Sequence, residues 1–277
     1  MIDKQQLPFL IKLVDDPSPT VRAKVAQKLR VFGSSVWQEI EHLHLEVSEE
    51  QRSVLAEILH AHDNAALKSA WRSWQKMDDD GERLEEALRL LANWQMGQGS
   101  GARLRRLLDG LAEEFTHAGI VPHATALSLF LFEKKGLHGA SEDYYNPLNS
   151  NLVYVIETGQ GIPITLACIF ILVGKRLGIP IHGLAFPGHF LAHAHDGTRE
   201  MVFDCFDGGR LLSGAEMVAL RKAAPEAMRM PVTAITIIAR VVRNLANAYY
   251  QANDTDKARF ILSLLSGLEL PEHQKRS

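Results

Sequence analysis

A histidine and an aspartate, spaced so that a β-hairpin brings them together, are the residues of this sequence best suited to chemistry. His189 opens one apolar run and Asp204 closes the next, with Asp196-Gly197 between them. Asp-Gly is typical of a two-residue type I′ turn, which pairs His195 with Thr198 and sets His189 directly opposite Asp204. Opposed side chains share a face with Cβ atoms about 4.5–5.5 Å apart. The spacing predicts an imidazole–carboxylate hydrogen bond, which is either half of a catalytic triad or a structural contact of a partly buried histidine.

An acyl-transfer reaction also needs a nucleophile, and three residues come into question. Cys168 lies within an apolar run, where a small buried cysteine with an inert thiol is the usual interpretation. Cys205 follows Asp204, so its side chain points to the opposite face of the strand and is interpreted as packing. Thr165 either serves as a hydroxyl nucleophile or bonds the backbone of a first helical turn, and we favour the backbone role.

Other polar residues in the same stretch have a binding and a structural interpretation. His193 and His195 face one side of a strand and could chelate zinc with His189 or Glu200, but solvated edge histidines are commoner. We therefore expect no metal and no cofactor. Three candidate ligand-binding residues have turn, capping or solvation roles as alternatives, namely Asn149, Asn151 and Glu157.

The elements that must position these residues are a buried helix and three strands. The helix, at about 164–177, is apolar on nearly every side and is followed by Gly178 and Pro180, which typically end a helix. Strands are predicted around 181–186, 189–195 and 199–206. The more apolar face of this sheet carries Phe190, Ala192, Met201 and Phe203.

Helical patterns occupy the rest of the chain. Two stripes at 7–14 and 21–32, broken by a D-P-x-P-like turn, resemble one HEAT-type repeat. Ser48 and Gln51 form a capping-box pattern at the start of a further helix. A pair of stripes after residue 232 resembles a single tetratricopeptide-type hairpin.

Composition narrows the classes of function. The net charge is −3 with no long basic run, so we expect no nucleic-acid partner. The apolar, uncharged stretch at 158–174 contains Gly and Pro and is shorter than a membrane span, so we expect no membrane insertion. Two cysteines and no apolar leader favour the cytoplasm.

Six spaced motifs in order resemble the bacterial SirB-type transglutaminase-like family, best over about 82–212. They are FEKKGLHG at 132–139, YNPLNS at 145–150, GIPITL at 161–166, LGIP at 177–180, PGHFL at 187–191 and DCFDGG at 204–209. The resemblance implies a papain-like α+β core with a nucleophilic Cys at the helix start, where a thiolate is stabilised, and the His and Asp carried over to His189 and Asp204. The Cys position falls at or next to Pro163.

The sequence thus predicts an α+β fold, mainly helical, with a central helix on a small antiparallel sheet. Its three parts are a HEAT-like region at 1–95, a transglutaminase-like core at 96–230 and a tetratricopeptide-like hairpin at 231–277. Two functions stay open. One is a non-catalytic module that binds a peptide or protein; the other is an amide hydrolase or acyl transferase using His189, Asp204 and a hydroxyl or water.

Overall fold

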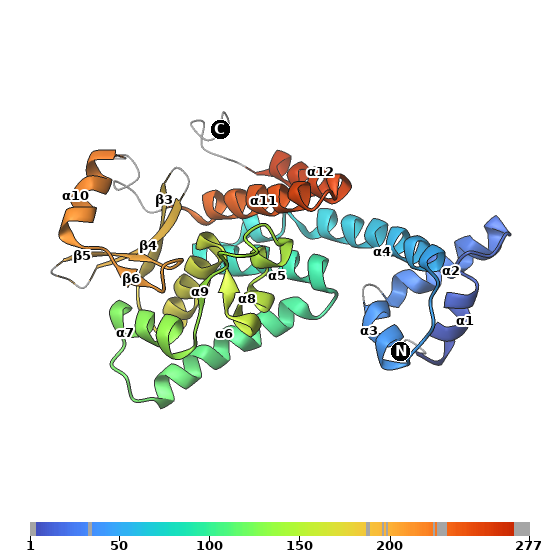
Figure 1. The fold of residues 1–277 in the computed structure, drawn as a ribbon, viewed down its shortest axis with the longest axis horizontal. Helices are drawn as coiled ribbons and strands as arrows, with labels where there is room; N and C mark the ends of the chain where they lie inside the picture. The colour runs from blue at the N-terminus through green and yellow to red at the C-terminus, as the bar shows by residue number, and fades with distance from the viewer. Residues whose placement is uncertain are drawn as a thin grey trace.

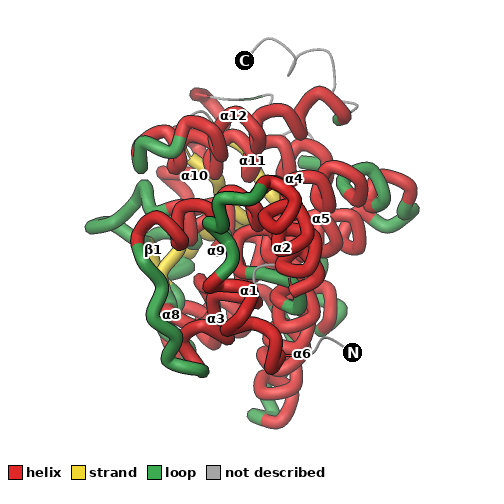
Figure 2. The backbone as a smooth tube through the Cα atoms, turned by 90° about the vertical axis from the view of Figure 1, so that its right-hand side faces the viewer, coloured by secondary structure: helices red, strands yellow, loops and turns green. Residues whose placement is uncertain are grey.

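The computed structural model describes residues 4–268 except 33–34, 187–188, 196, 198, 224 and 226–231. It is mostly helical with two small sheets, which agrees with the expected α+β class. Figure 1 shows the four-stranded sheet at one end, the bulk of the helices in the middle and the first helices at the other end. Figure 2 shows how little of the backbone is strand.

The N-terminal helices form a core of their own. They are α1 (Leu7–Lys12), α2 (Pro19–Phe32) and α3 (Ser35–His42), joined to the rest by α4 (Glu49–Ala70). The predicted capping box at the start of α4 is confirmed, because Ser48 Oγ accepts the Gln51 N–H at 3.1 Å and the Gln51 side chain accepts the Ser48 N–H. Near its start α4 gives Leu55 and Leu59 to this core, and near its end it gives Leu67 to the larger one.

The larger core takes in buried residues from Leu67 to Leu268. Its helices are α5 (Asp80–Met96), α6 (Ser100–His117), α7 (Ala124–Ser128) with the π-helical turn η3 (Leu129–Lys134), α8 (Leu152–Thr158), α9 (Pro163–Arg176), α11 (Ala234–Gln251) and α12 (Thr255–Ser263). Short elements connect them: η2 (Trp74–Lys76), η4 (Pro147–Ser150), η5 (Leu264–Gly267), and a parallel pair of strands β1 (His138–Gly139) and β2 (Gln160–Gly161). The expected C-terminal helical hairpin is α11–α12. The three domain boundaries remain predictions, since all three segments contribute to this core.

Helix α9 is central, as its composition predicts. Every residue from Pro163 to Gly174 is buried. It packs against one face of the antiparallel sheet β3 (Ile181–Phe186), β4 (His189–His195), β5 (Glu200–Asp204) and β6 (Arg210–Leu211), in that order. Phe170 of α9 meets Phe203 edge to face, with ring centroids 5.3 Å apart. The predicted apolar face of the sheet therefore faces α9.

The predicted hairpin register is wrong by two residues. His195 pairs with Glu200 rather than with Thr198, and Ala192 pairs with Phe203. Asp196 and Thr198 lie outside the described residues. The observed register places a small residue opposite a large one beneath α9, whereas the predicted one would oppose the two bulky rings of Phe190 and Phe203. Because the shift is even, every side chain keeps its predicted face.

The outer face of the sheet is covered by α10 (Gly214–Ala223), through a small cluster of apolar side chains. Its members are Leu184, Phe186, Leu191, Val202 and Met217. Met217 is the only buried residue of the described α10, so this helix lies loosely on the sheet. In Figure 1 α10 lies above β5, at the sheet end of the molecule.

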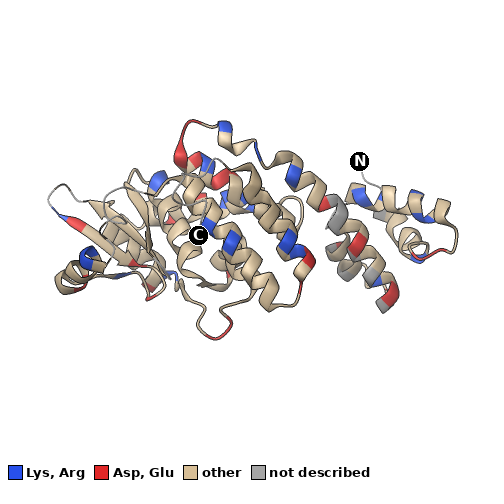
Figure 3. Cartoon of the chain, turned by 90° about the horizontal axis from the view of Figure 1, so that it is seen from above, with Lys and Arg blue, Asp and Glu red and all other residues tan. Residues whose placement is uncertain are grey.

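Lys and Arg are scattered among Asp and Glu along the helices in Figure 3. Among the described residues we find no helix with the length and hydropathy of a membrane span.

Candidate functional site

His189 and Asp204 meet, as the sequence predicts, but as diagonal neighbours. His189 Nε2 lies 2.9 Å from Asp204 Oδ2. Continuing the observed register sets Leu191 opposite Asp204, and a diagonal neighbour about 7–8 Å away is still within reach of an imidazole. His189 begins β4 and Asp204 ends β5, so the contact closes the end of the β4–β5 pair.

The carboxylate of this pair is held in its ionised form. Burial raises the pKa of Asp204, but the hydrogen bond and charge of His189, with the N–H groups of Asp207 and Phe206, lower that pKa by more. An ionised carboxylate only accepts hydrogen bonds, so His189 Nε2 is the donor. In the neutral ring Nδ1 is then the nitrogen that can accept a proton or a hydrogen bond.

The pair lies at a pocket of about 360 Å³ between the outer sheet face and α10. Most of the lining is apolar, and Arg210 and Glu216 stand at the rim as an ion pair 2.9 Å apart. We call this pocket the α10 groove; it is lined by His189, Leu191, Asp204, Arg210, Leu212, Glu216, Ala219, Leu220 and Ala223. The His–Asp pair thus faces α10, on the side of the sheet away from the body of α9.

The start of α9 carries no ionisable side chain. Pro163 occupies the first helical position and Ile162 the cap, and both are buried. Thr165 is fully buried; its Oγ1 accepts the Ile162 N–H at 3.1 Å and donates to the carbonyl of Asn149 at 2.9 Å or of Ile162 at 3.0 Å. The hydroxyl therefore caps the helix, which is the role favoured by the sequence.

Neither cysteine can present a thiolate to the pair. Cys168 and Cys205 are both fully buried, on the α9 side of the sheet. Burial raises the pKa of the Cys168 thiol far above its ordinary range. Burial, then the charge of Asp204 and the second thiol, raises the pKa of Cys205. Both are packing residues, which agrees with the sequence interpretation.

The three candidate ligand-binding residues all have partners within the protein. The Asn149 amide donates to the carbonyl of Asp143 at 2.6 Å. Asn151 Oδ1 caps α8 by accepting the N–H of Val153 at 3.0 Å, whereas its buried Nδ2 has no hydrogen-bond partner among the described residues. Both side chains are almost fully buried, so neither is accessible to a ligand in this structure. Glu157 forms an ion pair with an arginine of α6, Arg103.

The histidines expected as a lesser zinc site are also engaged otherwise. His193 Nε2 lies 3.1 Å from Glu200 Oε1, at ion-pair distance but without hydrogen-bond geometry. Glu200 is paired in addition with Arg221 of α10. Burial lowers the pKa of His193, Glu200 opposes this, and His182 and His195 add to it. Within the described ranges no group of three or more such side chains is arranged to hold a metal ion.

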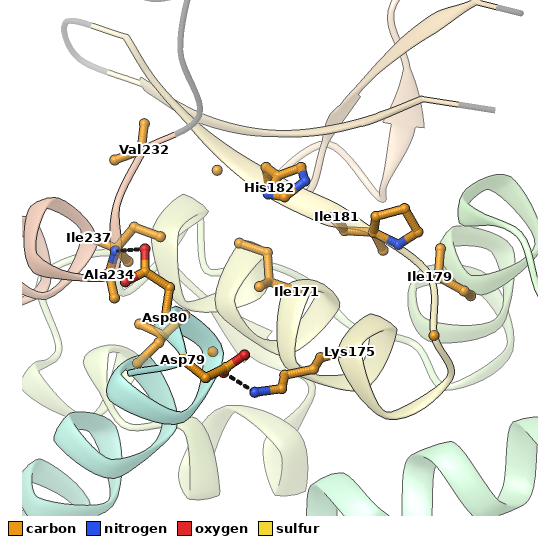
Figure 4. Close-up of a pocket in the computed structure, with 15 residues that line it drawn as sticks. Asp79, Asp80, Ile171, Lys175, Ile179, Ile181, His182, Val232, Ala234 and Ile237 are labelled. Carbon is orange, nitrogen blue, oxygen red and sulfur yellow. Dashed lines mark hydrogen bonds and ion pairs between the residues drawn. The ribbon is translucent and has the colours of Figure 1, made fainter. Parts of the chain in front are cut away.

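A second pocket of about 380 Å³ lies away from the His–Asp pair, between α5, α9, β3 and the start of α11 (Figure 4). Its lining is mainly apolar, with several isoleucines, and two of its acidic side chains have partners within the protein. Asp79 caps α5 and pairs with Lys175, and Asp80 accepts the N–H of Ala234 at 3.1 Å. We therefore interpret this pocket as a structural contact region, in which a side chain of α5 caps the start of α11.

Two parts of the site were not foreseen from the sequence. The first is α10 as the wall of the groove. The second is Arg240 of α11, which donates to the carbonyls of Phe186 and His189, both at 2.9 Å. The one available signal for Arg240 was a charged residue among the apolar residues of its helix, which also contains Arg243.

Comparison with known proteins bears directly on this region. A family described as the transglutaminase-like superfamily matches residues 100–243, which is more than half of the chain. A UPF0162 protein of Xylella fastidiosa is 38% identical over 144 residues, covering 48% of this chain and 51% of that protein. One from Vibrio cholerae is 31% identical over 83 residues, covering 30% of each. F-box only protein 21 of mouse is 33% identical over 82 residues, covering 30% of this chain and 13% of that protein.

The chain spans about half the length of the Xylella relatives it matches. No solved structure matches it.

Proposed function

The chain belongs to the transglutaminase-like superfamily, and from that premise we propose that it is a non-catalytic member that binds a peptide segment of a partner protein in the α10 groove. The observation that carries this proposal is the set of groups at the site. The His–Asp pair is present, but both thiols are buried with raised pKa values, and the hydroxyl of Thr165 is buried and caps a helix.

The groove supports a peptide with an aliphatic side chain as occupant. Its volume of about 360 Å³ falls in the range of ligand sites, about 300–1,000 Å³. Leu191, Leu212 and Leu220 offer apolar contacts, and His189 at one end offers a hydrogen-bonding nitrogen. An extended peptide presents both an apolar side chain and a backbone N–H or C=O at such a site.

The narrower assignments are proposals as well. The ordered motifs support the SirB-type branch of the superfamily. The helical pair α1–α2 supports a HEAT-like N-terminal region, and the pair α11–α12 supports a tetratricopeptide-like tail. Two unpaired cysteines support a cytoplasmic location.

The test is selection of peptides from a random displayed library against the purified chain, followed by fluorescence anisotropy with the selected peptides. Ala219→Trp fills the groove, whereas Val218→Trp adds the same side chain at a neighbouring, exposed position of α10 that does not line it. We expect Ala219→Trp to abolish binding and Val218→Trp to leave it unchanged. Peptides whose affinity is the same for both variants would exclude the groove as the binding site.

The second candidate is an amide hydrolase or acyl transferase with water as nucleophile. It is favoured by one observation: the His189 side chain is 36% exposed, and its Nε2 is held by a carboxylate, as a general base requires. A screen of amide substrates separates the two candidates. Turnover that disappears in His189→Ala would establish the enzyme and reject the non-catalytic proposal; turnover that survives would reject His189 as the base.

A further inference from the structure

Arg240 is a charged side chain in the middle of an apolar helix. Its neighbours Ala239 and Val241 are fully buried, and the arginine itself is half-buried. Burial lowers its pKa, and the nearby Tyr144 hydroxyl opposes this, but a guanidinium stays charged at neutral pH. A buried charge is costly unless hydrogen bonds compensate for it. The partners of Arg240 therefore indicate why it is there.

Those partners are the two ends of one hairpin. Nη1 donates to the carbonyl of Phe186, the last residue of β3, and Nη2 donates to the carbonyl of His189, the first residue of β4. These two residues are themselves paired across the hairpin. The guanidinium carbon also lies 5.5 Å from the ring centre of Phe190. One planar fork thus holds both strand ends, which the single point charge of a lysine could not do with the same geometry.

His189 is consequently held at two points, one on its backbone and one on its ring. Its backbone carbonyl is held by Arg240, and its ring nitrogen Nε2 is held by Asp204. Since the pair is a diagonal contact across the sheet, the ring reaches the carboxylate only while the start of β4 keeps its position.

We propose that Arg240 is the positioning residue of the α10 groove: by clamping the β3–β4 strand ends it sets the imidazole of His189 against Asp204. This inference rests on the proposed binding function. It makes α11 part of the site. Arg240 lies inside the region that matches the superfamily, although the expected core ended at residue 230.

The test uses Arg240→Lys, which keeps the charge and loses the fork, with Arg259→Lys on the exposed side of α12 as the matched control. The first readout is the ¹⁵N spectrum of the His189 ring at pH 8. We expect the Nε2-protonated tautomer to dominate in the wild type and in Arg259→Lys, and a mixture of tautomers in Arg240→Lys. The second readout is the anisotropy of a fluorescein-labelled library-selected peptide. Without the clamp, peptide binding has to restore the position of His189 that one charge-assisted hydrogen bond had kept. We therefore expect the affinity of Arg240→Lys for the peptide to be at least about tenfold weaker than that of the wild type.

The outcomes separate the two proposals. If Arg240→Lys folds and its His189 ring spectrum matches the wild type, the clamp is refuted whatever the peptide does. If the library yields no binding peptide while the ring spectrum changes as expected, the binding function is rejected and the clamp stands. Should Arg240→Lys unfold, Arg240→Gln, which retains donors without the charge, takes its place. Unfolding of both variants would mean that Arg240 serves general stability, and would also overturn the proposal.

Discussion

The capping of α9 by Thr165 allows a quantitative prediction. Thr165→Val keeps the shape of the side chain and removes the hydroxyl. The buried N–H of Ile162 then loses its acceptor, and the carbonyl of Asn149 or Ile162 loses its donor. A buried unsatisfied donor costs about 1–3 kcal/mol, and a lost hydrogen bond roughly 1 kcal/mol more. We expect Thr165→Val to lower the free energy of unfolding by about 2–4 kcal/mol.

Thr165→Ser is the matched control, because it keeps the hydroxyl and loses one methyl group. Removing a buried methyl group costs about 1 kcal/mol. The assay is urea denaturation followed by circular dichroism, with the change in free energy taken from the midpoint at an unchanged m-value. If Thr165→Val costs less than Thr165→Ser, the hydroxyl does not cap the helix, and its interpretation as a functional group would have to be reopened.

Three further predictions follow from burial, backbone geometry and charge. Both thiols should resist an aromatic disulfide reagent in the folded protein and react within minutes in denaturant; fast reaction of either thiol in the native state would contradict the assigned burial. Gly209→Ala should destabilise the protein more than Gly208→Ala, because both glycines have positive φ but only at Gly209 would the added Cβ lie 2.1 Å from the Phe132 ring. The expected costs by thermal or urea unfolding are about 1–2 kcal/mol for backbone strain at Gly208, and at least 1–3 kcal/mol more at Gly209; equal costs would refute the close contact. Because the folded-state pKa of His193 is lowered, its contribution to stability is complete above its ordinary pKa of about 6.5 and is lost as the pH falls from there through the lowered folded-state pKa. His193→Gln should therefore reduce the fall in melting temperature between pH 8 and pH 5.5, and an unchanged fall would show that this ring is not buried as described.

The sequence predicted what depends on periodicity and missed what depends on the fit between elements. The buried α9 and the strand faces followed from the spacing of apolar residues, and the Ser48 cap followed from its local motif. The hairpin register failed because the Asp-Gly signal is local, whereas the pairing of Ala192 with Phe203 is set by packing beneath α9. His189 and Asp204 were nevertheless brought together, since an even shift preserves the face.

The rest of the site lay beyond one-dimensional reasoning for the same reason. Arg240 is 51 residues from His189, and nothing in its local pattern specifies a carbonyl partner. The α10 groove exists because a weakly apolar helix covers the sheet with one buried side chain, a feature that periodicity does not reveal. Asn149 and Asn151 looked available because their burial, and their hydrogen bonds to Asp143 and Val153, could not be seen in the sequence.

Helix α4 has a consequence for how the molecule responds to force and to proteases. Its 22 residues extend about 33 Å, and they belong to the N-terminal core at one end and to the main core at the other. The junction between the two cores is thus continuous hydrogen-bonded helix, with no loop for a protease to enter. A pull or a twist applied to the N-terminal helices is transmitted as strain along one rigid axis to Leu67 and the helices packed around it. The N-terminal helices and the main core are therefore mechanically coupled through α4.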